Sequence, residues 1–183
     1  PRWFPAAAAG MLLLGGLLFA SSPTSAQQAT VVSIDAPSNV TSGANFTATV
    51  DVDQVTDFDS ASYDVVFDNA VLTLVSVANG SIGGTAIPVT NSPGSASPSR
   101  VVQNVPGLAG VTGSGTLITI TFNATGADGT SSDIELTSLV LGDNSAQQIQ
   151  TTFQSDTVVV GTPATPTPVP TGTVTPTAIP SLN

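Results

Sequence analysis

The side chains of this sequence that could do chemistry are almost all carboxylates. The chain carries eleven Asp, one Glu and two Arg, and it has no Lys, His or Cys. Four of the aspartates lie close together, at Asp51, Asp53, Asp57 and Asp59. A glycosidase needs two carboxyl groups about 5 to 10 Å apart, one of which must hold a proton at neutral pH. The alternation of residues 45–53 turns Asp51 and Asp53 toward water, away from the apolar surroundings that a catalytic acid needs, so we expect no catalysis.

The same acidic segment is a candidate for calcium, which takes several hard oxygen ligands. However, the sequence DVDQVTDFD at residues 51–59 lacks the Gly and the twelfth-position Glu of an EF-hand loop. An acidic rim that keeps the domain soluble explains the cluster more simply. We therefore expect no metal site and no cofactor.

The missing residue types exclude further chemistry. Without His or Cys there is no Ser-His-Asp triad, no Cys-His dyad and no zinc site, and without Lys there is no Schiff base. A net charge of −10 repels the phosphates of nucleic acid, so we expect no nucleic-acid partner. The sequence thus indicates a binding or structural module and not an enzyme.

The two ends differ in composition from the middle. Arg2, the apolar run at 6–20 and the small residues up to Ala26 are typical of a signal peptide, which predicts cleavage after Ala26. The run is shorter than the roughly 20 residues of a membrane-spanning helix, so we expect a secreted or cell-surface protein whose mature domain does not insert into a membrane. Residues 162–183 hold six Pro and seven Thr, a composition that predicts a semi-rigid linker.

The middle of the chain, residues 27–161, reads as a single all-β domain. Short runs rich in Val, Ile and Thr are separated by Gly, Pro, Asn and Asp, and no helical period interrupts them. Nine short strands without helices predict two antiparallel sheets packed face to face, a jelly-roll β-sandwich. The expected strands are 30–35, 45–53, 60–67, 71–77, 85–90, 100–105, 116–123, 133–141 and 153–160.

The order of motifs in this region resembles the cohesin domain of cellulosome scaffoldins. The matching features are an aromatic-Asp turn at 67–68, an L-x-x-V-S-V-x-x-G run at 72–80, a G-x-L-x-x-I-x-F strand at 115–122, and a closing strand pair within 132–160. The resemblance covers about residues 29–161. It implies a flattened nine-stranded jelly roll that binds dockerin, a small calcium-loaded helical module, on one face of a sheet.

The resemblance also implies which residues bind the partner. In the family an Asn and an Asp on the third strand bind dockerin, and these places fall on Ser60 and Ser62, where this sequence departs from the pattern. Strand alternation places both serines and Asp64 opposite the apolar side of the same strand. The other contacting residues implied by the resemblance, from the strand at 100–105, are Arg100, Gln103 and Asn104.

We therefore expect a non-catalytic, secreted adaptor that binds a dockerin-type partner in an extracellular assembly linked to polysaccharide breakdown. A second interpretation is a carbohydrate-binding module. Sugar rings usually stack on exposed Trp and Tyr, but Trp3 lies in the expected signal peptide and Tyr63 has the parity of the core. A third interpretation is a structural or adhesion module of a cell-surface protein, in which the proposed contact residues are ordinary solvated strand residues.

Overall fold

Strands account for the regular structure of residues 28–161, which a computed structural model describes. The expected signal peptide at 1–26 and linker at 162–183 lie outside the described residues. Within residues 28–161 the structure contains no helix, so none that could cross a membrane. The strands are β1 (Thr30–Asp35), β2 (Asn39–Val40), β3 (Asn45–Val66), β4 (Leu72–Ile82), β5 (Thr85–Ile87), β6 (Ser99–Asn104), β7 (Val111–Ala124), β8 (Ser131–Asp143), β9 (Gln148–Ile149), β10 (Thr151–Gln154) and β11 (Asp156–Val160).

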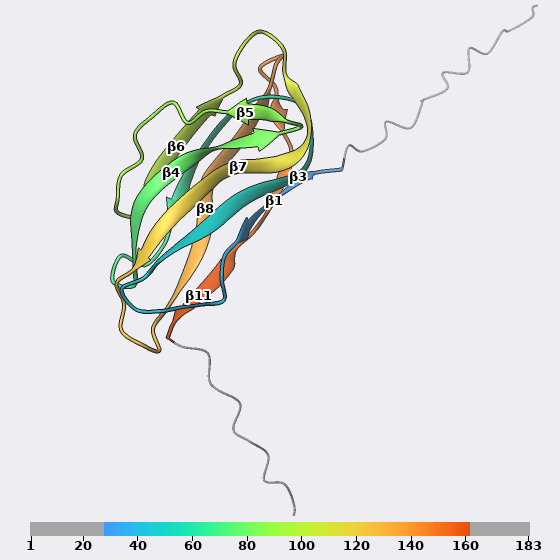
Figure 1. The fold of residues 1–183 in the computed structure, drawn as a ribbon. Coiled ribbons are helices and arrows are strands. Elements are labelled where there is room, and N and C mark those ends of the chain that lie inside the picture. Colours follow the sequence, from blue (N-terminus) through green and yellow to red (C-terminus); the bar gives the residue numbers. More distant parts are fainter. Residues whose placement is uncertain (1–27, 162–183) are drawn as a thin grey trace, which may run out of the picture.

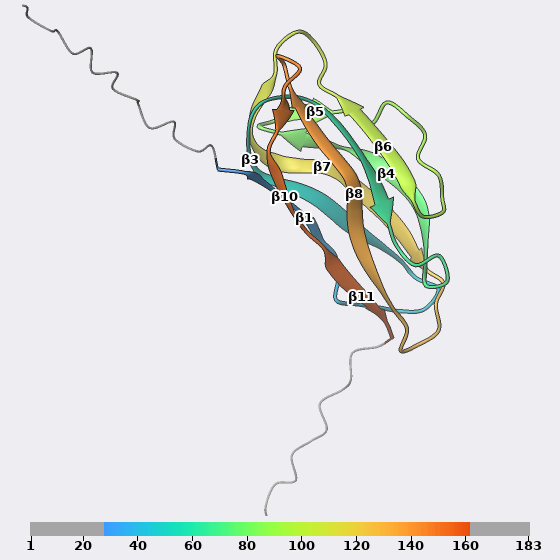
Figure 2. The same ribbon diagram turned by 180° about the vertical axis from the view of Figure 1, so that it is seen from behind.

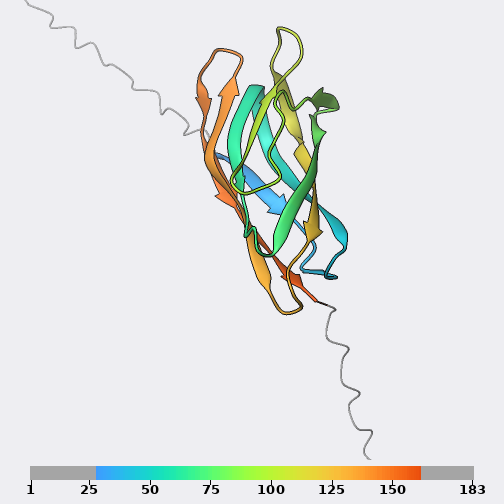
Figure 3. The same ribbon diagram turned by 90° about the vertical axis from the view of Figure 1, so that its left-hand side faces the viewer.

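The strands form the two layers of a jelly-roll sandwich, which Figure 3 shows edge-on. The first sheet contains, in order, β10, β1, β3, β7, β4 and β5, and it faces the viewer in Figure 1. The second contains β6, β3, β8, β11 and β2, with β9 beside the end of β8. The expected all-β jelly roll is therefore confirmed.

Strand β3 belongs to both layers, and this differs from the expected strand boundaries. Its first part pairs with β7 from Asn45 to Phe58, and its last part pairs with β6 and β8 up to Val66. The register shifts after Val50, Val52 and Val55, so the strand bends from one sheet into the other without a turn. The two strands expected at 45–53 and 60–67 are one bent strand.

The core lies between the sheets and follows the expected alternation. Ala61, Tyr63, Val65 and Phe67 on β3 or just after it are all buried, as their spacing predicts. The ring of Phe122 lies 5.1 Å from that of Phe67, measured between ring centroids, in an edge-to-face arrangement. Apolar packing of this kind holds together a domain that has no disulfide.

Candidate functional site

The outer surface of β6, β3 and β8 is the candidate site. Figure 2 shows these three strands side by side and facing the viewer. Residues directly opposite each other on neighbouring strands share a face, so the pairing defines three rows across it. We call these nine residues the serine face. Its rows are Asn104–Ser60–Gly142, Val102–Ser62–Val140 and Arg100–Asp64–Thr137.

The structure brings five of the six expected contact residues together on this face. Ser60, Ser62 and Asp64 lie on the middle strand and are half-buried. Arg100 and Asn104 lie on β6 and are exposed. The parity of β3 placed these three residues correctly, because they alternate with the buried Ala61, Tyr63 and Val65.

Arg100 is engaged within the face itself. Its Nε and Nη2 donate to the two carboxylate oxygens of Asp64 at 2.6 and 2.8 Å, and its Nη1 donates to Ser62 Oγ at 3.0 Å. The Arg100 side chain is 50% exposed and that of Asp64 is 16% exposed. A bidentate pair of this kind fixes the guanidinium plane and cancels both charges locally.

Gln103 does not lie on the serine face, which corrects the expectation that it binds a partner. Its side chain is fully buried between the sheets. Its Nε2 donates to the backbone carbonyls of Leu117 and Ile87 at 2.7 and 3.2 Å, and its Oε1 accepts from the Tyr63 hydroxyl at 2.9 Å. The alternation of β6 gives the reason, because Gln103 shares the inward parity of Val101.

A register shift explains why the core needs this amide. Between β3 and β7 the pairing moves from Val50 with Ile118 to Asp51 with Thr116, so Leu117 is left without an opposite residue on β3. The backbone carbonyl of Leu117 turns inward, and the side-chain amide of Gln103 donates a hydrogen bond to it. The amide thus ties the second sheet to the first.

Tyr63 cannot serve as a sugar-stacking platform. It is fully buried, and burial raises the pKa of its hydroxyl well above the ordinary value of about 10. Of the described phenylalanines, Phe46 and Phe153 are the ones that are partly exposed, and both pack against the core. The described residues therefore present no flat exposed aromatic surface.

A β-bulge in β8 shapes the serine face, and the sequence did not reveal it. Ser62 pairs with Val140 and Asp64 with Thr137, so two residues of β8, Ser138 and Leu139, lie opposite one residue of β3. Ser138 has a φ of 53°, in the left-handed region that non-glycine residues seldom adopt. After the bulge Val140 points outward and is 47% exposed.

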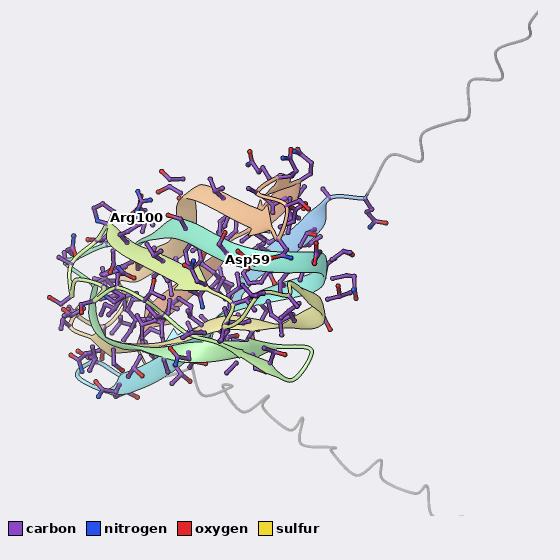
Figure 4. All side chains as sticks on the ribbon, turned by 90° about the horizontal axis from the view of Figure 1, so that it is seen from above. Asp59 and Arg100 are labelled. Atoms are coloured by element: carbon purple, nitrogen blue, oxygen red, sulfur yellow. The ribbon has the colours of Figure 1, made fainter. Side chains whose placement is uncertain are left out.

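The acidic segment that the sequence singled out is dispersed. Asp51 accepts hydrogen bonds from the hydroxyls of Thr49 and Thr116, both at 2.6 Å, and Asp53 accepts the backbone N–H of Val31 at 2.8 Å. Within residues 28–161 no three acidic side chains lie together in a way that could hold a metal ion. Asp59, the last aspartate of this segment, also lies well apart from Arg100 in Figure 4.

Comparisons with known proteins agree with this architecture. A family model described as "Cohesin domain" matches residues 30–160. A non-cellulosomal cohesin from Archaeoglobus fulgidus is 15% identical, with a TM-score of 0.60 over 74% of this chain and 93% of that one. The third cohesin ScaC of Acetivibrio cellulolyticus, solved in complex with the ScaB dockerin, is 15% identical, with a TM-score of 0.61 over 72% and 98%.

A further structure with the same fold is the sixth cohesin of scaffoldin B from Acetivibrio cellulolyticus, solved in complex with a Cel5 dockerin. It is 16% identical, with a TM-score of 0.60 over 73% of this chain and all (100%) of that one. No curated protein gives a significant sequence match. At these identities the solved structures establish the fold, and the family model establishes the family.

Proposed function

This chain belongs to the cohesin family, and we propose that it is a non-catalytic module that binds a dockerin-type partner through the serine face. The observation that supports this proposal best is a solvent-facing surface of three paired strands on a sandwich whose residues 30–160 match the family model. The strands that form the face are fixed by pairing on both sides of β3. A face that is already in its final shape loses little entropy on binding.

The proposed contact residues are Ser60, Ser62, Asp64, Arg100 and Asn104. Gln103 is left out because its side chain is buried. Ser60 and Ser62 stand where the family has the Asn and Asp that bind dockerin, so at these two positions the proposed partner pairs with hydroxyl groups in place of an amide and a carboxylate. This change concerns partner choice and not the fold.

The proposed setting is extracellular. We propose that residues 1–26 direct export, that residues 162–183 tether the module to others, and that the assembly takes part in polysaccharide breakdown. A tether of this composition would raise the effective concentration of a bound partner near its neighbours. The composition of both segments supports the setting.

The first test measures binding directly. The full chain would be titrated by calorimetry with calcium-loaded dockerin modules, among them the Cel5 and ScaB dockerins and those encoded in the same genome. We expect at least one to bind, and to bind only with calcium. If every dockerin fails to bind, the proposed function is wrong.

A substitution then locates the interface. Ser62→Arg places a long charged side chain at the centre of the face and should weaken dockerin binding at least tenfold, without lowering the melting temperature. The matched control is Thr121→Arg, because Thr121 is a half-buried hydroxyl residue of β7 in the other sheet. Equal effects of the two variants would place the interface elsewhere.

A pull-down with the same purified chain distinguishes carbohydrate binding from dockerin binding. The buried Tyr63 argues against it, because stacking on a sugar ring needs an exposed aromatic face. The chain alone would be mixed with insoluble cellulose, chitin and xylan and centrifuged. Retention on any of them without a protein partner would support carbohydrate binding in place of dockerin binding.

A further inference from the structure

Two adjoining cavities lie beside the bend of β3, away from the serine face, and Thr56 lines both of them. Their volumes are about 300 and 180 Å³, and the larger one reaches the lower end of the size range of small-molecule sites. We call the two together the bend cleft. Its lining side chains are mostly polar and include those of Asp53, Asp57, Asp143, Gln148 and Gln150.

Two carboxylates of the bend cleft are held in place through one oxygen each. Asp53 Oδ1 accepts the backbone N–H groups of Val31 and of the next residue in the chain, at 2.8 and 2.6 Å. Asp143 Oδ1 accepts those of Ser145 and Gln147, both at 2.8 Å. No hydrogen bond from residues 28–161 reaches the Oδ2 atom of either aspartate. Each Oδ2 is therefore an oriented acceptor, and a ligand that uses it loses little entropy in ordering the site.

The backbone of Asp57, between these two carboxylates in the lining, is held in an unfavourable conformation. Its φ is 55°, in the left-handed region that non-glycine residues seldom adopt. Its N–H donates to Thr112 Oγ1 and its carbonyl oxygen accepts the N–H of Asn144, both at 3.0 Å. A Cβ on Gly110 would come within 2.5 Å of the same carbonyl oxygen, so the loop before β7 also packs closely on it. Conformations held in this way gather at functional sites.

The other polar groups of the bend cleft can both donate and accept hydrogen bonds. Thr56, Gln148 and Gln150 are exposed, and their side chains make no hydrogen bond with any of residues 28–161. A hydroxyl group or a side-chain amide offers at least one donor and one acceptor. The cleft thus combines fixed carboxylate acceptors with adaptable groups of both kinds.

The charge of the bend cleft narrows the class of ligand. Within residues 28–161 the one cationic side chain is Arg100, which binds Asp64 on the serine face, so an anion would meet carboxylates without compensation. No three acidic side chains of the same residues lie together in a way that could hold a metal ion. A neutral ligand that carries many hydroxyl groups matches the mixture of donors and acceptors best, because each hydroxyl group also donates and accepts.

We propose that the bend cleft binds a short, soluble, neutral saccharide. Asp53 and Asp143 accept hydrogen bonds from its hydroxyl groups, and Thr56, Gln148 and Gln150 pair with the remaining ones. None of the described residues that line the cleft is aromatic, so the dissociation constant should be modest, on the order of 1 mM. Such a site would not retain the chain on an insoluble polysaccharide, and it is independent of dockerin binding.

The test observes the cleft directly by nuclear magnetic resonance. The ¹⁵N-labelled full chain would be titrated separately with cellobiose, xylobiose and chitobiose, the soluble disaccharide units of the three insoluble polysaccharides used above. We expect at least one disaccharide to shift the backbone amide signals of Thr56, Gln148 and Gln150 in a saturable way. The amide signals of Ser60 and Ser62 on the serine face should stay unchanged.

A pair of matched double variants checks the assignment. Thr56→Val combined with Gln150→Ala removes two exposed polar groups of the cleft and should weaken saccharide binding at least tenfold. The control combines Thr152→Val with Gln154→Ala, two exposed residues of β10 that line neither cavity, and should change binding less than twofold. The melting temperatures of both variants should equal that of the unchanged chain.

The outcomes separate this inference from the proposed dockerin binding. Ser62→Arg should weaken dockerin binding and leave saccharide binding within twofold. If none of the three disaccharides shifts the cleft signals, or if the cleft variant binds as well as its control, the saccharide site is wrong while the dockerin function stands. Shifts caused by calcium chloride and by no disaccharide would show a cation site in place of a saccharide site. Saccharide binding in a chain that binds no dockerin would support this inference alone.

Discussion

The inward and outward sides of β3 and β6 both carry polar groups, but the two sides hold them in opposite ways. Inside, Gln103 and Tyr63 are fully buried, and each of their polar atoms has a protein partner. Outside, Arg100 and Asp64 bind each other while remaining in contact with water. Two residues one position apart, Gln103 and Asn104, thus experience different environments.

The difference separates stability from recognition. A buried polar group is costly when its partner is removed, because water cannot replace the lost hydrogen bond. An exposed group loses little, because water can replace it. The inner network should therefore set the stability of the sandwich, and the serine face should be free to vary with its partner.

The largest expected effect comes from removing the inner amide. Gln103→Leu leaves the Tyr63 hydroxyl and the carbonyls of Leu117 and Ile87 without their partner. Each buried unsatisfied group costs about 1–3 kcal/mol, so the free energy of unfolding should fall by about 3 kcal/mol or more. Urea denaturation measures this. Asn104→Leu, the exposed neighbour, should change the free energy by less than about 0.5 kcal/mol, and an equal loss would remove the distinction between the two sides.

The second effect is a loss of stability in alkali. Burial raises the pKa of Tyr63 in the folded state, while the unfolded state ionises near pH 10. Above pH 10 the unfolded state therefore binds fewer protons, and the free energy of unfolding should fall by about 1.4 kcal/mol per pH unit. Below pH 10 this contribution is fully retained.

The composition makes that measurement clean. The chain has one Tyr and no Lys or Cys, so no other side chain of those types titrates in this range. Phenolate absorbance at 295 nm should appear together with unfolding, and Tyr63→Phe should abolish the pH dependence. Phenolate that appears near pH 10 in a chain that is still folded would show that Tyr63 is not isolated from water.

The smallest effect is expected at the outer ion pair. Because Arg100 is half exposed, its pair with Asp64 should contribute less than about 1 kcal/mol to stability. A double-mutant cycle with Arg100→Gln and Asp64→Asn measures the coupling, which should decrease at high salt. A coupling energy above about 2 kcal/mol would show that this exposed pair stabilises the fold as strongly as the buried hydrogen bonds of Gln103 and Tyr63.

The sequence predicted the sandwich well because alternation depends only on neighbouring residues. The parity of Ser60 to Phe67 followed from a strict two-residue period, and Tyr63 was correctly assigned to the core. The prediction that Gln103 lies on the binding face was wrong, because Gln103 has the same inward parity as Val101 although its side chain is polar. The alternation of β6 by itself predicts the buried position of Gln103.

Other features needed the structure because they depend on distant strands. The bulge at Ser138 cannot be recognised in the sequence of β8, because the strand has apolar residues on both faces and either register would give an acceptable core. The bend of β3 between the sheets likewise depends on which partner each half finds. The Arg100–Asp64 pair joins strands 36 residues apart in sequence.

The pairing of β1 with β10 has a mechanical consequence. Strand β1 runs parallel to β10, with Thr30 to Ser33 opposite Thr151 to Gln154, and the described chain starts and ends far apart in Figure 1. Tension applied between Gln28 and Gly161 would slide these strands along each other, so their hydrogen bonds would be loaded in shear and would resist together. A fold connected in this way is suited to carrying force between whatever it joins.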